Sequence, residues 1–217
     1  MNKEWSEMNK TMQLQIKKKD TFLSGIDTLL KLREQLMKQI LQFKTELSLD
    51  DFNAMPYINA KGYHNKTIAY SLWHIFRIED IVAHTLIAGD EQVFFRGNYQ
   101  ERINSPITTT ANELVKEEIK EFSKQIQIEE LYHYLFEVNQ STTEILKELT
   151  YDECKKKISG EKRHTLETLQ VVSKDENAYW LIDYWCNKDV RGLIQMPFSR
   201  HLIMHIEACL KIKNKIL

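Results

Sequence analysis

Apolar residues recur along much of this chain at alternating steps of four and three, the spacing of a helix that buries one face in a bundle. Residues 20–48, 128–149 and 197–216 carry one such seam each, and in residues 67–88 apolar side chains cover most of the helical circumference. The C-terminal seam consists of Phe198, Leu202, His205, Cys209, Ile212 and Ile216. The pattern predicts an all-α fold, an antiparallel four-helix bundle with short additional helices.

The segments between these helices are more polar and predict turns or short elements. Residues 1–19 end in three lysines and indicate a loosely held arm or a short surface helix, and residues 20–217 are expected to form one domain. Residues 90–106 indicate an irregular connection. Thr110-Ala-Asn-Glu113 has the spacing of a capping box and predicts a short helix to about residue 124. Residues 169–172 indicate either a strand or the start of a helix.

Composition excludes several classes of protein. The chain has 217 residues with only 6 Gly and 3 Pro, which argues against a glycine-rich nucleotide-binding sheet. A net charge of −1 provides no field that attracts nucleic acid. The 3 cysteines are widely spaced, which favours a reducing compartment over a disulfide framework. No apolar run reaches the ~18 residues that span a bilayer. We therefore expect a soluble cytoplasmic protein with no nucleic-acid or membrane partner.

The C-terminal helix carries the first candidate chemistry. His201 and His205 lie one turn apart on an otherwise apolar face, so both side chains can point at one metal ion. The alternative is that they are buried histidines satisfied by hydrogen bonds. A metal site needs a third ligand from another helix, for which His74 is the candidate and Glu79 the fallback. We expect His84 to pair with Asp80 on a more solvated face.

The remaining histidines are expected to be solvent-exposed or to lie at the surface: His64 in a loop, His133 off its helical seam, and His164 in a charged loop. Arg33 and Glu79 are charged residues on apolar seams of helices expected to be neighbours. We predict that they pair, or that Glu79 accepts a hydrogen bond from a ligand histidine; alternatively, one of them reaches water at a seam edge.

Three histidines would leave a fourth coordination position open, as in catalytic rather than structural zinc-type sites. A cation there would act as a Lewis acid or lower the pKa of a bound water or thiol. Cys209, one turn beyond His205, is an alternative fourth ligand that would close the site, or a plain packing residue. The aromatic residues of the segment 179–185 either pack in the core or form a pocket wall beside the metal.

The run from Ser71 to Asp80, Ser-Leu-Trp-His-Ile-Phe-Arg-Ile-Glu-Asp, together with His201-x-x-x-His205, resembles the DinB superfamily. The resemblance covers residues 20–217 and rests on the three histidines and their helical context. It implies a metal-binding four-helix bundle in which His74, His201 and His205 hold a divalent cation, with zinc or nickel expected. It also implies transfer of a low-molecular-weight thiol, such as bacillithiol, to an electrophilic small molecule.

Two functions remain open at this point. The first is a metal-dependent thiol S-transferase or a related hydrolase, with a thiol and a small electrophile as its partners. The second is a non-catalytic helical bundle, with a structural metal or only buried histidines, that acts as a dimeric interaction or stress-response module. The sequence names neither the metal nor the substrate, and a homodimer is compatible with both functions.

Overall fold

Long helices form where the hydrophobic periodicity predicts them. The computed structural model describes residues 2–217 and is all-helical, with no β-strand in that range and a single isolated bridge between Lys157 and Asp189. The long elements are α2 (Phe22–Glu46), α4 (Ile68–Asp80) with its π-helical continuation η2 (Ile81–Ala88), α8 (Ile128–Glu148), and α12 (His201–Ile216), which follows the π-helical turn η4 (Met196–Arg200).

Shorter helices fill the connections. They are α1 (Lys3–Gln15), η1 (Lys19–Thr21), α3 (Leu49–Asn53), α5 (Val93–Arg96), α6 (Tyr99–Ile103), α7 (Glu117–Gln125), η3 (Glu153–Lys155), α9 (Gly160–Leu169), α10 (Glu176–Cys186) and α11 (Val190–Ile194). The connection at residues 90–106, expected to be irregular, thus contains α5 and α6.

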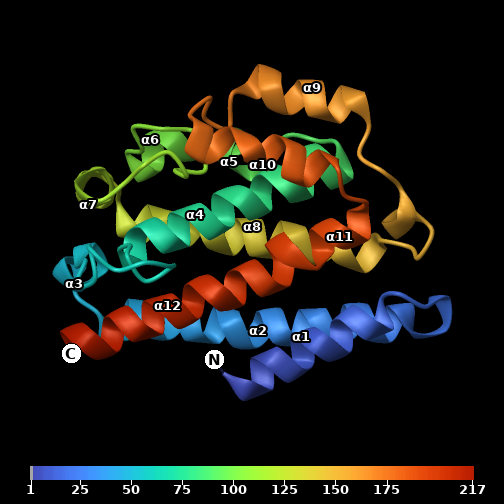
Figure 1. The fold of residues 1–217 in the computed structure, drawn as a ribbon, viewed down its shortest axis with the longest axis horizontal. Helices are drawn as coiled ribbons and strands as arrows, with labels where there is room; N and C mark the ends of the chain where they lie inside the picture. Colours follow the sequence, from blue (N-terminus) through green and yellow to red (C-terminus); the bar gives the residue numbers. More distant parts are fainter. Residues whose placement is uncertain (1) are drawn as a thin grey trace.

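The four long helices run as two parallel pairs, which corrects the expectation of a simple antiparallel order. Helices α2 and α12 run in one direction, and α4 and α8 run in the opposite direction (Figure 1). Helices α8 and α2 are antiparallel, and the Tyr132 hydroxyl of α8 donates a hydrogen bond to the Ile40 carbonyl of α2 at 2.9 Å. Helices α4 and α8 are parallel because the long connection between Gly89 and Gln127 returns the chain to the end at which α4 began.

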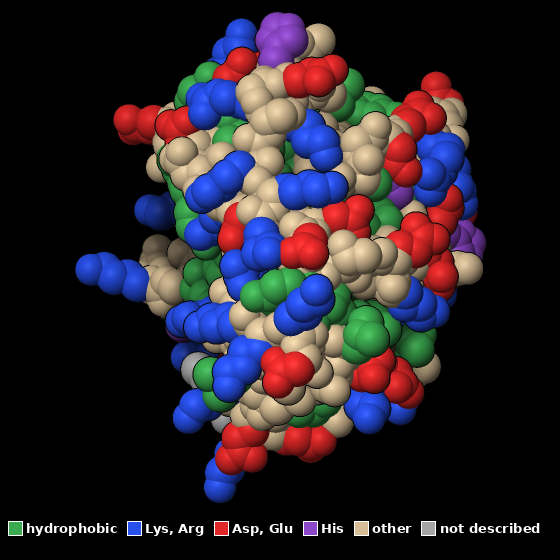
Figure 2. Space-filling model, turned by 90° about the vertical axis from the view of Figure 1, so that its right-hand side faces the viewer, with side chains coloured by type: hydrophobic (Ala, Val, Ile, Leu, Met, Phe, Trp, Pro, Cys, Tyr) green, Lys and Arg blue, Asp and Glu red, His purple; other side chains and the backbone are tan. Residues whose placement is uncertain are grey.

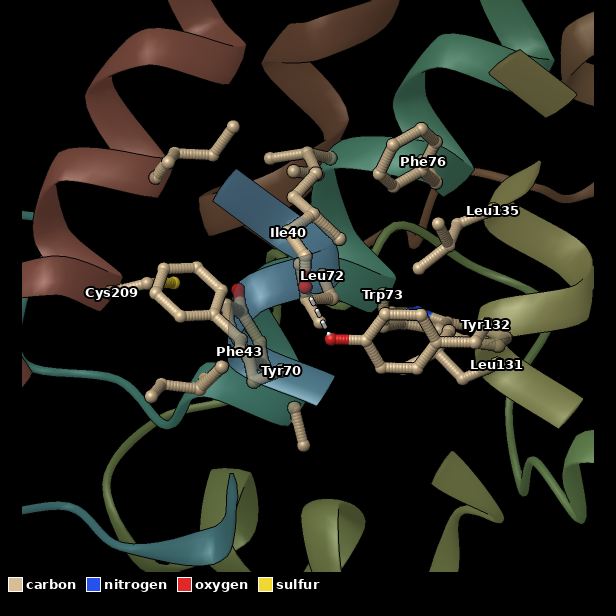
Figure 3. Packing of buried hydrophobic residues seen from close by; sticks show 14 of the residues in the cluster. Ile40, Phe43, Tyr70, Leu72, Trp73, Phe76, Leu131, Tyr132, Leu135 and Cys209 are labelled. Atoms are coloured by element: carbon tan, nitrogen blue, oxygen red, sulfur yellow. Dashed lines mark hydrogen bonds between the residues drawn. The ribbon is translucent and has the colours of Figure 1, made fainter. Parts of the chain in front are cut away.

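Apolar side chains from all four helices meet in the interior. Figure 3 shows Ile40 and Phe43 of α2 facing Trp73 of α4, Leu135 of α8 and Cys209 of α12, all of them buried. Burying one such large side chain stabilises a fold by ~1.5–3 kcal/mol. The predicted seams are therefore the faces that join these helices.

Residues 2–19 do not form a loose arm. Helix α1 packs along α2 and buries Trp5, Met12 and the following Ile16. The close approach depends on Gly25, since a Cβ added there would lie 2.5 Å from Ile16 Cγ2 and 2.9 Å from Ile16 N. The expected surface helix is present, but its apolar residues are part of the core.

Two local expectations are wrong. Thr110–Glu113 is no capping box, because α7 begins later, at Glu117, and Ala111 has a left-handed φ of 62°. The segment is instead held against α4 by hydrogen bonds. At residues 169–172, Leu169 ends α9, and Val171 and Val172 are buried without joining a strand or a helix.

The surface mixes charges of both signs. On the face in Figure 2, Lys and Arg side chains are interspersed with Asp and Glu side chains. Within residues 2–217, no helix combines the length and the apolar character that crossing a bilayer requires.

Candidate metal centre

Three buried histidines from α4 and α12 converge in the interior. His74 lies midway along α4, and His201 and His205 occupy the first two turns of α12. Their nearest potential ligand atoms all lie within 4.8 Å of one another, and the exposed fractions of the three residues are 4%, 7% and 3%. These three histidines could hold a metal ion, as the helical spacing predicted.

The hydrogen bond of His74 fixes the orientation of its ring. His74 Nδ1 lies 2.7 Å from the Thr110 carbonyl, so Nδ1 carries the proton and Nε2 presents a lone pair. That Nε2 is 3.2 Å from Nε2 of His201. Two nitrogens bound at 2.0–2.1 Å around a tetrahedral cation lie about 3.3 Å apart, so this separation suits two ligands of one ion. A backbone carbonyl behind a histidine is also the usual support of a metal ligand.

Several nitrogen atoms of this cluster have no hydrogen-bond partner among the described residues. They are both ring nitrogens of His205 and Nδ1 of His201. A neutral imidazole carries one N–H, and leaving a buried polar group unsatisfied costs ~1–3 kcal/mol. The donor set therefore fits a divalent cation that accepts nitrogen ligands, such as zinc or nickel.

Burial keeps the three rings neutral. Desolvation lowers the pKa of His74 to about 4, although its hydrogen bond to Thr110 acts in the opposite direction. Burial also holds the pKa values of His201 and His205 well below the ordinary value, and repulsion from neighbouring histidines adds to the effect. Neutral imidazole is the form that binds metal. Competition by protons is therefore expected at a lower pH than the ~6.5 of an unperturbed histidine.

Cys209 lies outside the cluster, against the alternative that it closes the site. It is buried beside Phe43 and Tyr70 in the apolar interior (Figure 3), and burial raises the pKa of its thiol to about 12. Among the described residues, the potential ligand atoms that lie within 4.8 Å of one another belong to His74, His201 and His205 and not to Cys209, so Cys209 acts as a core residue.

Arg33 and Glu79 form the predicted ion pair. Arg33 Nη2 and Nη1 donate to the two carboxylate oxygens of Glu79 at 2.6 and 2.9 Å, and both side chains are buried. Nη2 also donates to Asn139 Oδ1 at 2.7 Å. Since both oxygens of Glu79 accept from Arg33, its expected roles as fallback ligand or as acceptor for a ligand histidine are not supported.

Side chains of α4 hold the segment after α6 in place. Four consecutive carbonyls, from residue 108 to residue 111, accept hydrogen bonds from α4. The donors are Arg77 to Thr108 at 2.7 Å, Trp73 to Thr109 at 3.2 Å, His74 to Thr110 at 2.7 Å, and Tyr70 to Ala111 at 2.9 Å. The histidine cluster is thereby attached to a fixed backbone, and Asn112 is brought next to it.

A cavity of about 300 Å³ adjoins the cluster. His74 and His201 form part of its wall, with Trp180, Tyr184 and Trp185 of α10. The aromatic segment thus contributes to a pocket wall, the second of its two predicted roles, while the buried Trp185 also packs in the core. Tyr63, which also lines the cavity, packs edge-on against His205 with ring centroids 4.9 Å apart.

The environment of His84 differs from the one expected. It is 1% exposed, and its Nδ1 lies 2.7 Å from Asp90 while its Nε2 lies 3.0 Å from Ser141 Oγ and 3.9 Å from Asp80. The Ser-His-Asp order resembles a hydrolase triad, but the cavity of about 800 Å³ nearby is lined by Asp90 and by neither His84 nor Ser141. We interpret these contacts as a structural tie between α4, α8 and the loop.

The other histidines lie apart from the cluster. His133 and His164 are exposed, as expected. His64 is half-buried in its loop, where it packs against Tyr57. Sequence reasoning missed Thr110, Tyr63 and Asn112, because all three lie in loops whose path no periodic pattern predicts.

Comparisons with protein-family models and with curated proteins find no match for this chain. The functional interpretation therefore depends on the geometry of the site and on the resemblance carried by the three histidines.

Proposed function

We propose that this protein is a divalent-metal-dependent enzyme of the DinB type, which transfers a low-molecular-weight thiol to an electrophilic small molecule. In this proposal α2, α4, α8 and α12 form the four-helix bundle, and His74, His201 and His205 are the metal ligands. Support comes from three neutral nitrogen donors on two facing helices, with a cavity alongside.

The observation that carries the proposal is the state of His205. Its ring is almost fully buried, and neither of its nitrogens has a hydrogen-bond partner among residues 2–217. Buried polar groups in native proteins are almost always satisfied. A cation shared with His74 and His201 would bind the lone pair of one His205 nitrogen and leave only the N–H of the other without a partner, whereas without a cation both nitrogens are unpaired, at ~1–3 kcal/mol for each unsatisfied group.

The surrounding residues have definable tasks around such a cation. Thr110 fixes the tautomer of His74, so that Nε2 is the binding atom. Tyr63 covers His205, and the aromatic wall of α10 limits access of bulk water. When bound, a divalent cation with three neutral ligands supplies Lewis acidity, which lowers the pKa of a coordinated water or thiol.

Elemental analysis of purified protein tests the metal site. We expect about one equivalent of a divalent metal in the wild-type protein, as three converging ligands require. The variant His205→Ala should lose most of it. His133→Ala is the matched control, because His133 is more than half exposed and pairs only with Glu130. Wild-type protein that neither contains metal nor takes up added zinc or nickel would contradict the proposal.

A conjugation assay tests the reaction. Metal-loaded protein is mixed with bacillithiol or cysteine and with monochlorobimane, whose fluorescence rises when a thiol displaces its chloride. We expect turnover with wild type and His133→Ala, and none with His205→Ala or after chelation. Full metal occupancy without transfer from either thiol would instead favour the non-catalytic bundle with a structural metal.

A further inference from the structure

The cavity beside the histidine cluster has a wall of unusual composition. Eleven residues line it, among them Tyr63, Asn112, Trp180, Tyr184, Trp185 and Met196. Helix α10 supplies one side, and α4 and the η4 turn supply the other. None of these lining residues is Asp, Glu, Lys or Arg, although such residues make up 28% of the chain.

We propose that this cavity binds the flat, uncharged, apolar body of an organic molecule whose one polar group faces the histidines. This inference rests on the proposed function, because the bound molecule would be the electrophilic substrate. It assigns that substrate to planar hydrophobic compounds of about two rings, and it excludes organic cations and nucleotides.

The aromatic side chains supply the attraction. The rings of Trp180 and Tyr184 lie 5.7 Å apart and nearly perpendicular, at 72°. The indole nitrogen of Trp180 donates to the Asn177 carbonyl at 2.9 Å, so its polar group is already paired within α10. Trp180 is nonetheless 50% exposed. A flat ligand that covers a half-exposed aromatic ring beside an apolar cavity removes the remaining apolar surface of that ring from water, which favours binding.

The absence of charged lining residues sets the charge of the ligand. A charge buried against apolar walls loses its hydration without a compensating partner. A cationic ligand also meets the Lys188 ammonium, which lies 4.2 Å from the Tyr184 ring centroid. Asn112 and the Tyr63 hydroxyl remain as neutral hydrogen-bonding groups.

The size of the cavity sets the size of the ligand. Small-molecule sites usually measure ~300–1,000 Å³. At about 300 Å³ this cavity is at the lower end of that range. It therefore suits a compact two-ring compound better than a nucleotide.

A fluorescence titration with 6-propionyl-2-dimethylaminonaphthalene, a neutral two-ring dye whose fluorescence changes when it moves from water to apolar surroundings, tests this inference. It is performed on the full-length protein, both zinc-loaded and after chelation. We expect saturable binding that naphthol displaces and that N-methylquinolinium, a cation of similar size and shape, does not. Displacement by both compounds with equal potency would overturn the charge argument.

Three variants locate the binding. Trp180→Ala should weaken binding roughly three- to tenfold, the effect of removing one aromatic contact. Tyr179→Ala is the matched control, since Tyr179 is a neighbouring half-exposed aromatic residue of α10 that does not line the cavity. Met196→Trp adds a large ring inside the wall and should abolish binding without removing a histidine. Equal weakening by Trp180→Ala and Tyr179→Ala, or full binding by Met196→Trp, refutes the assignment.

The outcomes for metal and for dye separate the two proposals. Dye binding in a protein that takes up no metal would leave the cavity assignment standing while the proposed function fails. Metal binding and thiol transfer without dye binding would leave the function standing and remove the substrate class inferred here.

Discussion

The buried pair between Arg33 and Glu79 gives the sharpest stability prediction. The exposed fractions of the two side chains are 2% and 0%, and two short hydrogen bonds join them. Asn139 accepts a third bond, whereas Nε of Arg33 has no partner among the described residues. The perturbation is Glu79→Gln, which keeps the shape of the side chain and removes its charge.

The expected cost follows from what remains after the substitution. Arg33 stays charged at neutral pH and would be left in the interior with neutral side-chain acceptors, the amide oxygen at position 79 and Asn139 Oδ1, in place of a carboxylate. Removing one partner of a buried ion pair typically costs 3–5 kcal/mol, because the other charge is left uncompensated. Replacing both residues by apolar ones of similar volume is often neutral or stabilising. We therefore expect Glu79→Gln to lower the free energy of unfolding by ~3–5 kcal/mol, and Arg33→Met with Glu79→Leu to restore most of it.

Urea unfolding followed by far-ultraviolet circular dichroism measures these changes. The matched control is Asp183→Asn, which breaks the pair between Arg163 and Asp183 at a similar distance of 2.7 Å but on the surface. An exposed pair contributes ~0–1 kcal/mol, so this variant should unfold almost like wild type. Equal costs for Glu79→Gln and Asp183→Asn would refute the reasoning. A double variant less stable than Glu79→Gln would refute it as well.

Further predictions concern pH, packing and the thiol. Burial lowers the pKa of His74 to about 4, so between this value and ~6.5 the unfolded chain binds more protons than the folded protein. Metal-free protein should therefore lose stability as pH falls from ~6.5 towards 4, with no contribution from His74 above that range. Melting temperatures measured with a chelator check this. Gly25→Ala should cost ~1–3 kcal/mol in urea unfolding, because its Cβ meets Ile16, whereas Gly160→Ala, with nothing within 4 Å, should not destabilise. Cys209→Ala should leave metal content unchanged in elemental analysis while lowering stability, since the thiol lies in the core; loss of metal would reinstate it as a ligand.

The hydrophobic pattern alone determined the positions of the long helices. A seam can be recognised from the sequence because side chains three and four positions apart share one face of a helix. The seam of the last helix, for example, consists of Phe198, Leu202, His205 and Cys209. The same local rule placed His201 beside His205. It also indicated that charged residues on apolar seams, such as Arg33, need a partner.

The tertiary structure decided how these faces combine. His74 is more than a hundred residues from His201 in sequence, and their Nε2 atoms lie 3.2 Å apart because α4 packs against α12. The parallel pairing of α4 with α8 depends on the connecting segment, whose path no periodicity encodes. Likewise, Thr110 became the support of His74 through a loop held by side chains of α4.

Local signals failed where long-range packing or backbone geometry determined the structure. Thr110–Glu113 has the residues of a helix cap, yet α4 binds the carbonyls beside it and α7 starts later. His84 and Asp80 have the spacing of a surface pair, but α8 and the loop at Asp90 enclose them. The sequence by itself thus determined which long helices form and which face each buries. Only the packing of those helices decided that three histidines meet beside a cavity, because contacts between distant segments depend on the whole fold.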